Sequence, residues 1–264
     1  MYFNPDFKNK NVFISGATHG IGLQCLLDFS ALGANVITFS RDIKKINIAR
    51  KKLAKTKGNH FIKRGDVLDE NFLNSFSKII IKKYKRVDIL IHNVGGGGRW
   101  GNKNFFKTDN DVWQDVYDKN NKGLIILTKY FLPGMIKKKW GRIIAISSVN
   151  GMEAKEVDRP WFNAAKASQL AIIKSFSKKR IYTKSNITFN SISPGPILIK
   201  NTGWHREKIK NPIKYKKYIE NNIYTKNIGT PKDVSPICIF LSSKYSSYIN
   251  GCNILVDGGV SNKI

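Results

Sequence analysis

The chain has 264 residues, of which 41% are hydrophobic and 11% aromatic, enough for the core of one large α/β domain. The formal net charge is +28, but the basic residues are spread along the whole chain, so we expect a solvated surface and no specific nucleic-acid binding. No apolar run reaches the ~20 residues that span a bilayer, which excludes a helical membrane protein.

The N-terminal residues and the cysteines indicate the cellular setting. The N-terminal stretch lacks the apolar core of a signal peptide. Cys25, Cys238 and Cys252 lie far apart and have no metal-ligand spacing. We therefore expect a cytoplasmic protein with reduced thiols, no metal and no membrane association.

Strands alternate with helices along the chain. A buried strand at Val12–Ser15 leads into the glycine-rich turn Gly16–Gly22 and a helix through Leu32. Further strands are predicted at Asn35–Phe39, Asn59–Lys63, Val87–His92, Arg142–Ser147, Ile187–Ile192 and Asn253–Val256, and further helices at Asp42–Ala54, Asp69–Tyr84, Asp109–Lys137, Pro160–Thr183 and Pro231–Ser242. A break is expected near Pro133, and an irregular segment before Pro231. The alternation predicts a single-domain α/β fold over residues 1–264, a Rossmann-type doubly wound parallel sheet of about seven strands.

The turn Gly16–Gly22 has the features that phosphate binding requires. Glycine permits positive φ and close backbone approach, and the following helix offers unpaired N–H groups at the positive end of its dipole. Polar or glycine-rich sequences also follow the other predicted strands, at Ser40-Arg41, Asp66-Val67, Asn93–Gly98, Ser147-Ser148 and Ser193-Pro194-Gly195. Since ligands of such sheets bind beyond the carboxyl ends of the strands, these segments predict one nucleotide site.

With these motifs in order, the chain resembles the classical short-chain dehydrogenase/reductase family over nearly its whole length. The matching segments are Ser15–Gly22, Asp66-Val67, His92–Gly95, Asn120 with Gly123, Ile146–Ser148, Lys166 within AAKAS, Asn190–Pro196, Gly229–Val234 and Val256–Gly259. The resemblance implies an NAD or NADP cofactor. It implies cofactor contacts from Gly16, Thr18, His19, Gly20, Ile21, Gly22, Arg41, Asp66, Val67, Asn93, Gly95, Lys166, Pro194, Gly195 and Ile197.

The end of the second strand bears on the choice between the two cofactors. An acidic side chain there would bind the ribose 2′-hydroxyl, whereas an arginine favours a 2′-phosphate. The chain has Arg41, followed by Asp42. NADP is therefore the expected cofactor, with NAD possible.

The catalytic residues that the resemblance implies depart from the family at one position. Ser148, Lys166 and Asn120 match, with Ser148 binding the substrate oxygen, Lys166 holding ribose and Asn120 ordering a water. Four residues before Lys166, where the family has the tyrosine acid/base, stands Phe162. Three readings are open: an oxidoreductase that takes its proton from another group, a non-redox enzyme such as a dehydratase or epimerase, and a nucleotide-binding pseudoenzyme or scaffold.

Cationic and aromatic residues indicate the substrate class. Arg99 and Trp100 follow the glycine run, Arg159 precedes the helix of Lys166, and Trp204 and His205 lie in residues 197–228, which the resemblance makes a lid over the substrate. Such side chains suit an anionic or sugar-like oxo compound. His205 is also a candidate for the missing acid. The resemblance further implies a homodimer or homotetramer through the helices at 109–137 and 160–183.

Overall fold

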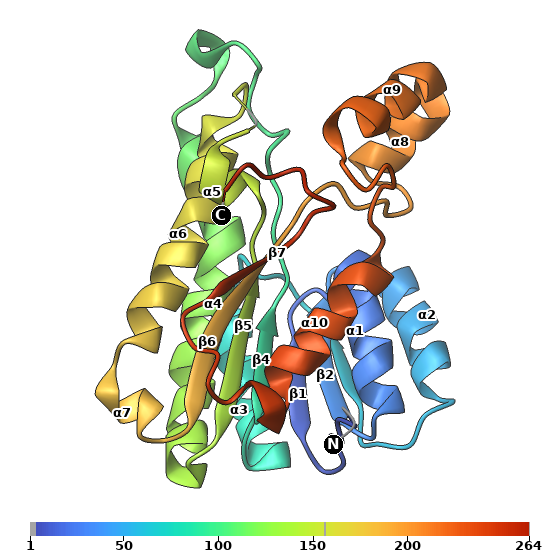
Figure 1. The fold of residues 1–264 in the computed structure, drawn as a ribbon. Helices are drawn as coiled ribbons and strands as arrows, with labels where there is room; N and C mark the ends of the chain where they lie inside the picture. The colour runs from blue at the N-terminus through green and yellow to red at the C-terminus, as the bar shows by residue number, and fades with distance from the viewer. Residues whose placement is uncertain (1–3, 156, 264) are drawn as a thin grey trace.

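Seven strands form one parallel sheet in the computed structural model, which describes residues 4–155 and 157–263 (Figure 1). The strands are β1 (Asn11–Ile14), β2 (Asn35–Ser40), β3 (Phe61–Arg64), β4 (Ile89–His92), β5 (Gly141–Ile146), β6 (Ile187–Pro194) and β7 (Asn253–Val256). Their order is β3-β2-β1-β4-β5-β6-β7, and every neighbouring pair is parallel. The chain therefore has the predicted doubly wound, Rossmann-like α/β architecture, with β1 and β4 adjacent at the point where the strand order reverses.

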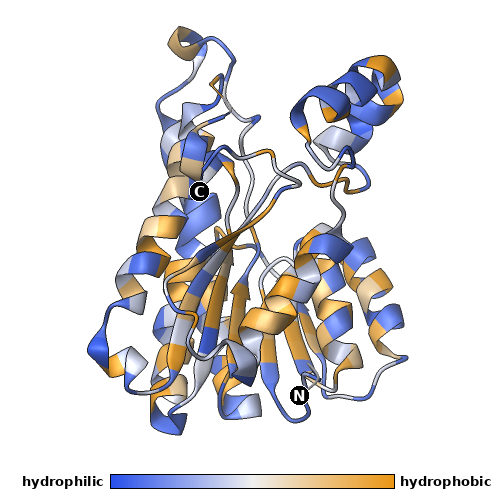
Figure 2. Ribbon diagram, in the orientation of Figure 1, coloured by the Kyte–Doolittle hydropathy of each residue, from blue (hydrophilic) through white to orange (hydrophobic). Residues whose placement is uncertain are grey.

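Helices cover both faces of the sheet. The helices on one face are α1 (Gly20–Ala31), α2 (Ile43–Leu53) and α10 (Pro231–Ser242), and those on the other are α3 (Glu70–Tyr84), α4 (Asp111–Lys138) and α6 (Pro160–Ser177). Successive β1 side chains alternate between the two apolar cores: Val12 and Ile14 pack in one, and Phe13 in the other. Strands buried on both faces need apolar residues throughout, as Figure 2 shows for the sheet.

Side-chain caps fix where several helices begin. Asp42 accepts a hydrogen bond from the backbone N–H of Lys45 at 3.1 Å, and Asp69 accepts one from Phe72 at 2.9 Å. These caps start α2 and α3 just after β2 and β3, so both strand ends stay open toward the same edge of the sheet.

Several helices of the structure differ from those expected from the sequence. Helix α4 continues through Pro133 without a break, because the buried side chains of Leu132 and Met135 hold it against the sheet on either side of the lost N–H. The helix predicted to reach Thr183 ends at Ser177, since Lys179 is extended, and resumes as α7 (Arg180–Thr183). A short α5 (Asn150–Glu153), which was not predicted, follows β5.

The segment expected to be irregular contains two helices, α8 (Gly203–Lys210) and α9 (Pro212–Asn222). Pro212 at the first turn of α9 separates them, and Tyr215 anchors the pair through its buried ring. Figure 1 places them beyond the carboxyl ends of the strands, above α1 and α2. Among the described residues, none of the helices combines the length and apolar character needed to cross a membrane.

Candidate active site

The turn between β1 and α1 is shaped by contacts that only glycine allows. Gly16 has φ +66°, and a Cβ there would lie 2.7 Å from Cγ2 of Val94. A Cβ on Gly22 would lie 2.5 Å from Nδ2 of Asn93. Helix α1 begins without a side-chain cap on His19, which leaves its first-turn N–H groups for a ligand. This cradle fits the phosphates of a dinucleotide.

A buried hydrogen-bond chain ties the glycine turn to α4. Oγ of Ser15 accepts from the backbone N–H groups of Asn93 (2.9 Å) and Val94 (3.1 Å), so its own proton goes to Nδ1 of His92, 3.2 Å away. Nε2 of His92 then donates to the carbonyl of Asn120 at 2.8 Å. Burial lowers the pKa of His92 to about 4, which keeps the ring neutral as this arrangement requires.

A cleft of about 340 Å³ lies beside the glycine turn, over the ends of β1, β2 and β4. Eight of the predicted cofactor residues line it: Gly16, Thr18, His19, Arg41, Asp66, Val67, Asn93 and Gly95. Arg41 pairs with Asp66 at 3.3 Å while remaining 65% exposed. Asp42 is occupied, because it caps α2 and pairs with Nζ of Lys45 at 3.6 Å. The cleft can therefore hold a nucleotide beside three cations, Arg41, Lys45 and Lys119.

Lys166 lies under this cleft with only 4% of its surface exposed. Its Nζ donates to the carbonyl of Ile146 (3.0 Å) and to Oε1 of Gln169 (2.9 Å). Burial lowers the pKa of Lys166 to about 7. A Cβ on Gly95 would lie 2.8 Å from this Nζ, so the glycine lets the ammonium approach the backbone of the cleft wall.

Asn120 holds the first part of the glycine run in place. Its Oδ1 accepts from the N–H of Gly96 at 3.2 Å, and its Nδ2 donates to the carbonyls of Gly96 (2.8 Å) and Val116 (2.7 Å). Its own carbonyl accepts from His92 and from Gln169. Only the second lone pair of Oδ1 remains for the water that the sequence assigned to this residue.

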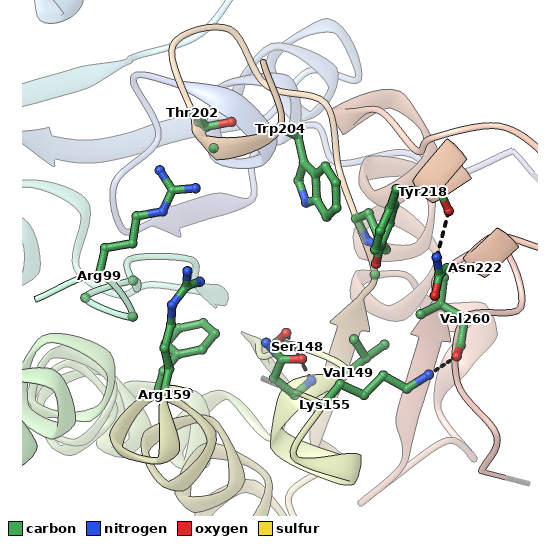
Figure 3. A pocket seen from close by; sticks show the side chains of 18 of the residues that line it. Arg99, Ser148, Val149, Lys155, Arg159, Thr202, Trp204, Tyr218, Asn222 and Val260 are labelled. Atoms are coloured by element: carbon green, nitrogen blue, oxygen red, sulfur yellow. Dashed lines mark hydrogen bonds between the residues drawn. The ribbon is translucent and has the colours of Figure 1, made fainter. Parts of the chain in front are cut away.

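A larger cavity, about 1230 Å³, opens between the sheet and the α8–α9 pair (Figure 3). Six cations line it: Arg41, Arg99, Lys119, Lys155, Arg159 and Arg206. No carboxylate side chain of the described residues lines it. Arg41 and Lys119 also line the nucleotide cleft, so the two spaces adjoin along these side chains. Arg41 and Lys155 have acidic partners outside the lining, Asp66 and Glu153, but the residues that face the cavity carry an excess of positive charge, which raises the local concentration of anions.

Ser148 and Phe162 face this cavity together. Oγ of Ser148 accepts from the N–H of Asn150 at 3.2 Å, which leaves the hydroxyl proton to be donated to a ligand. Phe162 lies one helical turn before Lys166 on α6, and Cγ of its ring is 3.2 Å from where a Cβ on Gly98 would stand. Phe162 offers no proton at this position.

Residues 197–228, the predicted lid, supply an aromatic wall. The ends of this segment are tied together, since Leu198 donates to the carbonyl of Gly229 at 2.7 Å. The rings of Trp204 and Tyr218 pack with centroids 4.4 Å apart, and both line the cavity. His205, the candidate replacement acid, does not line it.

The C-terminal segment forms another wall. Val260 and Asn262 line the cavity, and Nζ of Lys155 donates to the carbonyl of Val260. Lys155 also pairs with Glu153 at 3.3 Å, and Glu153 accepts from the N–H of Lys263 at 2.8 Å. Helix α5 thus fastens the chain end over the site.

Most of the residues predicted from the sequence line the cleft or the cavity, but some do not. Of the substrate candidates, Arg99, Trp100, Arg159 and Trp204 line the cavity, and so does Gly195 of the cofactor set. Six residues of the cofactor set line neither space: Gly20, Ile21, Gly22, Lys166, Pro194 and Ile197. Asn120 of the catalytic set lines neither space as well. Seven residues of the site were not predicted: Lys119, Lys155, Gln169, Tyr218, Tyr224, Val260 and Asn262. A signal existed only for Gln169, which lies three residues after Lys166 and so on the same helix face.

Known proteins resemble this chain over nearly its full length. Residues 16–261 match a family profile described as enoyl-(acyl carrier protein) reductase. The 3-oxoacyl-(acyl-carrier-protein) reductase FabG of Buchnera aphidicola subsp. Acyrthosiphon pisum is 32% identical, covering 97% of this chain and 98% of that protein. The dehydrogenase/reductase SDR family member 4 of Bos taurus is 29% identical, covering 97% and 88%.

Solved structures show the same fold. The L-sorbose reductase of Gluconobacter frateurii, solved with NADPH and L-sorbose, superposes with a TM-score of 0.89 at 23% identity, covering 99% of this chain and 100% of that one. Levodione reductase superposes with a TM-score of 0.86 at 22% identity, covering 96% and 98%.

Proposed function

Because the chain belongs to the short-chain dehydrogenase/reductase family of oxidoreductases, we propose that it interconverts a carbonyl and a hydroxyl on a small polar, anionic substrate with NADP. The observation that carries this proposal is the cation-lined cavity that contains Ser148 and adjoins the nucleotide cleft along Arg41 and Lys119. An anionic substrate would neutralise those cations beside the position where the hydride is exchanged.

The nucleotide cleft fits NADP, which supplies the hydride acceptor or donor when bound. The glycine turn and the uncapped start of α1 would hold the pyrophosphate. Arg41 and Lys45 would bind the 2′-phosphate, since both line the cleft and Asp42 already caps α2 and pairs with Lys45. The NADPH named in the sorbose reductase complex agrees with this choice.

The chain's own groups then divide the work on the substrate. The hydroxyl of Ser148 donates to the reacting oxygen, and Asn120 holds Gly96 beside it. Lys166 can hold or release a proton close to the wall of the cleft, because burial lowers its pKa to about 7. Phe162 cannot exchange a proton, so that step falls to a hydroxyl that faces the cavity, Ser148 or Tyr218 of the lid.

A cofactor titration tests the proposal. We expect NADPH to bind the wild type at least tenfold more tightly than NADH, followed by nicotinamide fluorescence. Arg41→Gln should remove most of that preference, because it removes a charge-assisted bond to the phosphate. Arg180→Gln, an exposed arginine on α7 away from the cleft, is the matched control and should bind like the wild type. Absence of binding of either cofactor by folded protein would contradict the oxidoreductase assignment.

A specific observation favours a second candidate, a nucleotide-binding protein that performs no redox chemistry. Phe162 stands in the cavity one turn before Lys166, where a proton donor would be expected. Phe162→Tyr discriminates between the two candidates when NADPH oxidation is followed with a panel of ketoses and oxo acids. Turnover by the wild type that does not rise in the variant supports a redox site built around Phe162. Turnover that appears only in the variant supports the binding protein.

A further inference from the structure

Two arginine side chains reach into the large cavity between the glycine run and the start of α8. Arg99 and Arg159 both line the large cavity, and Figure 3 shows their guanidinium groups reaching into the space below Thr202. Cδ of Arg159 lies 3.5 Å from the position of a Cβ on Gly98, the residue that precedes Arg99. Nη2 of Arg99 lies 2.6 Å from the position of a Cβ on Gly203, at the start of α8. The side chain of Arg159 thus passes Gly98 and that of Arg99 passes Gly203, and both reach the same part of the cavity.

Three arginines line this part of the cavity. Arg206 of α8 lines the same space as Arg99 and Arg159, held by a bond from Nη1 to the carbonyl of Asn201 at 2.9 Å. No acidic side chain of the described residues is among the lining residues. A ligand that carries two negative charges on one group would match the pair of Arg99 and Arg159.

The wall beside the arginine pair suits a ring with hydroxyl groups. Trp204 and Tyr218 pack against each other at 4.4 Å between centroids, and Figure 3 shows both rings turned toward the cavity. Aromatic faces contact the C–H surface of a sugar, while polar neighbours such as Asn222 are available to its hydroxyls. Ser148 lies across the same cavity, where the reacting oxygen would be bound.

We propose that the Arg99–Arg159 pair binds the phosphate of a phosphorylated sugar or related phosphomonoester, whose carbonyl or hydroxyl then lies at Ser148. A phosphomonoester carries nearly two negative charges and three terminal oxygens, and two planar guanidinium groups can each donate to it in bidentate fashion. A carboxylate offers only two oxygens and one charge. The position of the reacting group at Ser148 depends on the proposed function. The position of the phosphate depends only on Arg99 and Arg159.

Binding can be measured without turnover. Fructose 6-phosphate, fructose and gluconate are titrated into the protein with saturating NADP⁺, following the fluorescence of the cavity tryptophans Trp100 and Trp204 at constant ionic strength. We expect the phosphate ester to bind at least tenfold more tightly than fructose or gluconate. Equal binding of the three, or tighter binding of gluconate, would overturn the assignment.

Variants locate the phosphate. Arg99→Gln and Arg159→Gln should each weaken fructose 6-phosphate binding about ten- to a hundredfold, since each loses a charged hydrogen-bonding fork. Arg99→Lys keeps the charge and should recover only part of the affinity. Arg180→Gln again serves as the matched control. A loss in Arg180→Gln as large as that in Arg99→Gln would show a non-specific charge effect and overturn the site.

The same samples separate this proposal from the proposed function. NADPH binding is titrated in each variant, and we expect it to be unchanged in Arg99→Gln, because Arg99 does not line the nucleotide cleft. Retained NADPH binding with no phosphate-ester preference refutes the phosphate subsite alone. Loss of NADPH binding in the wild type refutes the dehydrogenase assignment, whatever the esters do.

Discussion

At the scale of single residues, His92 shows how a neutral side chain organises the site. It accepts from Ser15 at one ring nitrogen and donates to Asn120 at the other, so it joins the glycine turn to the helix that holds Gly96. Only the neutral ring can do both, because a protonated ring has two donors. The lowered pKa of His92 and its two hydrogen bonds therefore both require that the ring stay neutral.

We predict that acid destabilises the protein through His92. The folded-state pKa is lowered from 6.5 to about 4, so the unfolded chain binds the proton more readily. This contribution to stability is full above pH ~6.5 and is lost as the pH falls toward 4, on the order of 3 kcal/mol. Urea unfolding at a series of pH values measures it.

His92→Gln provides the comparison for that measurement. The variant should be less stable at pH 7 but should lose less stability between pH 6.5 and pH 4 than the wild type, because the titrating ring is gone. His60, which also has a pKa lowered by burial, remains in both proteins and cancels in the difference. An identical pH slope in wild type and variant would contradict the role given to His92.

How far the site residues could be predicted from the sequence depends on where they lie along the chain. Gly16, Asp66, Asn93 and Ser148 follow strand ends, and parallel strands bring those ends to one edge whatever the rest of the fold does. Lys119 is on the middle of α4 and Tyr218 is on the lid, so their approach to the cavity depends on tertiary packing. No local pattern marks such residues.

At the scale of elements, the sheet and its long helices were predictable and the lid was not. Apolar strands of four to eight residues and the caps at Asp42 and Asp69 are local signals that agree with the final fold. Helices α8 and α9 are rich in lysine and bury little beyond Tyr215, so they lack an apolar stripe from which a helix can be inferred. Pro212 is the first residue of α9, where a proline is compatible with a helix, so its presence did not rule one out.

The contact between α5 and the C-terminal segment leads to an element-scale prediction. Glu153→Ala removes the carboxylate that pairs with Lys155 and accepts from Lys263. We expect the chain end to be trimmed faster by a carboxypeptidase and fructose 6-phosphate to bind several-fold more weakly, because Val260 and Asn262 form a wall of that cavity. NADPH binding should stay unchanged, since neither residue lines the nucleotide cleft.

Glu70→Ala is the control for the chain-end experiment. Glu70 is an exposed carboxylate on α3 that pairs with Lys122 at 3.5 Å, remote from the C-terminal segment. Equal rates of trimming in Glu153→Ala and Glu70→Ala would show that the α5 contact does not restrain the chain end.

At the scale of the whole molecule, the positive charge and the position of the cavity act together. A net charge of +28 attracts anions from a distance, and the six cations that line the cavity concentrate that attraction there. We expect the affinity for NADPH and the affinity for fructose 6-phosphate both to fall as ionic strength rises. The affinity of the more solvent-exposed of the two sites should fall more steeply, because salt screens exposed charges more than buried ones. Isothermal titration at low and high potassium chloride concentration measures both slopes, and salt-independent affinities would contradict this charge argument.

The outer surface of α4 and α6 leads to a prediction about assembly. Tyr117 and Ile125 of α4 are 38% and 41% exposed, although both are large apolar side chains, and we propose that this surface pairs with a second copy. Light scattering should then give a mass of two or four times the 30.0 kDa protomer.

Ile125→Arg places a charge in that interface and should raise the dissociation constant more than tenfold. Ile43→Arg, at an isoleucine of α2 that is 50% exposed on the other face of the sheet, should leave the mass unchanged. A protomer mass for the wild type, or dissociation by Ile43→Arg as readily as by Ile125→Arg, would contradict assembly through α4.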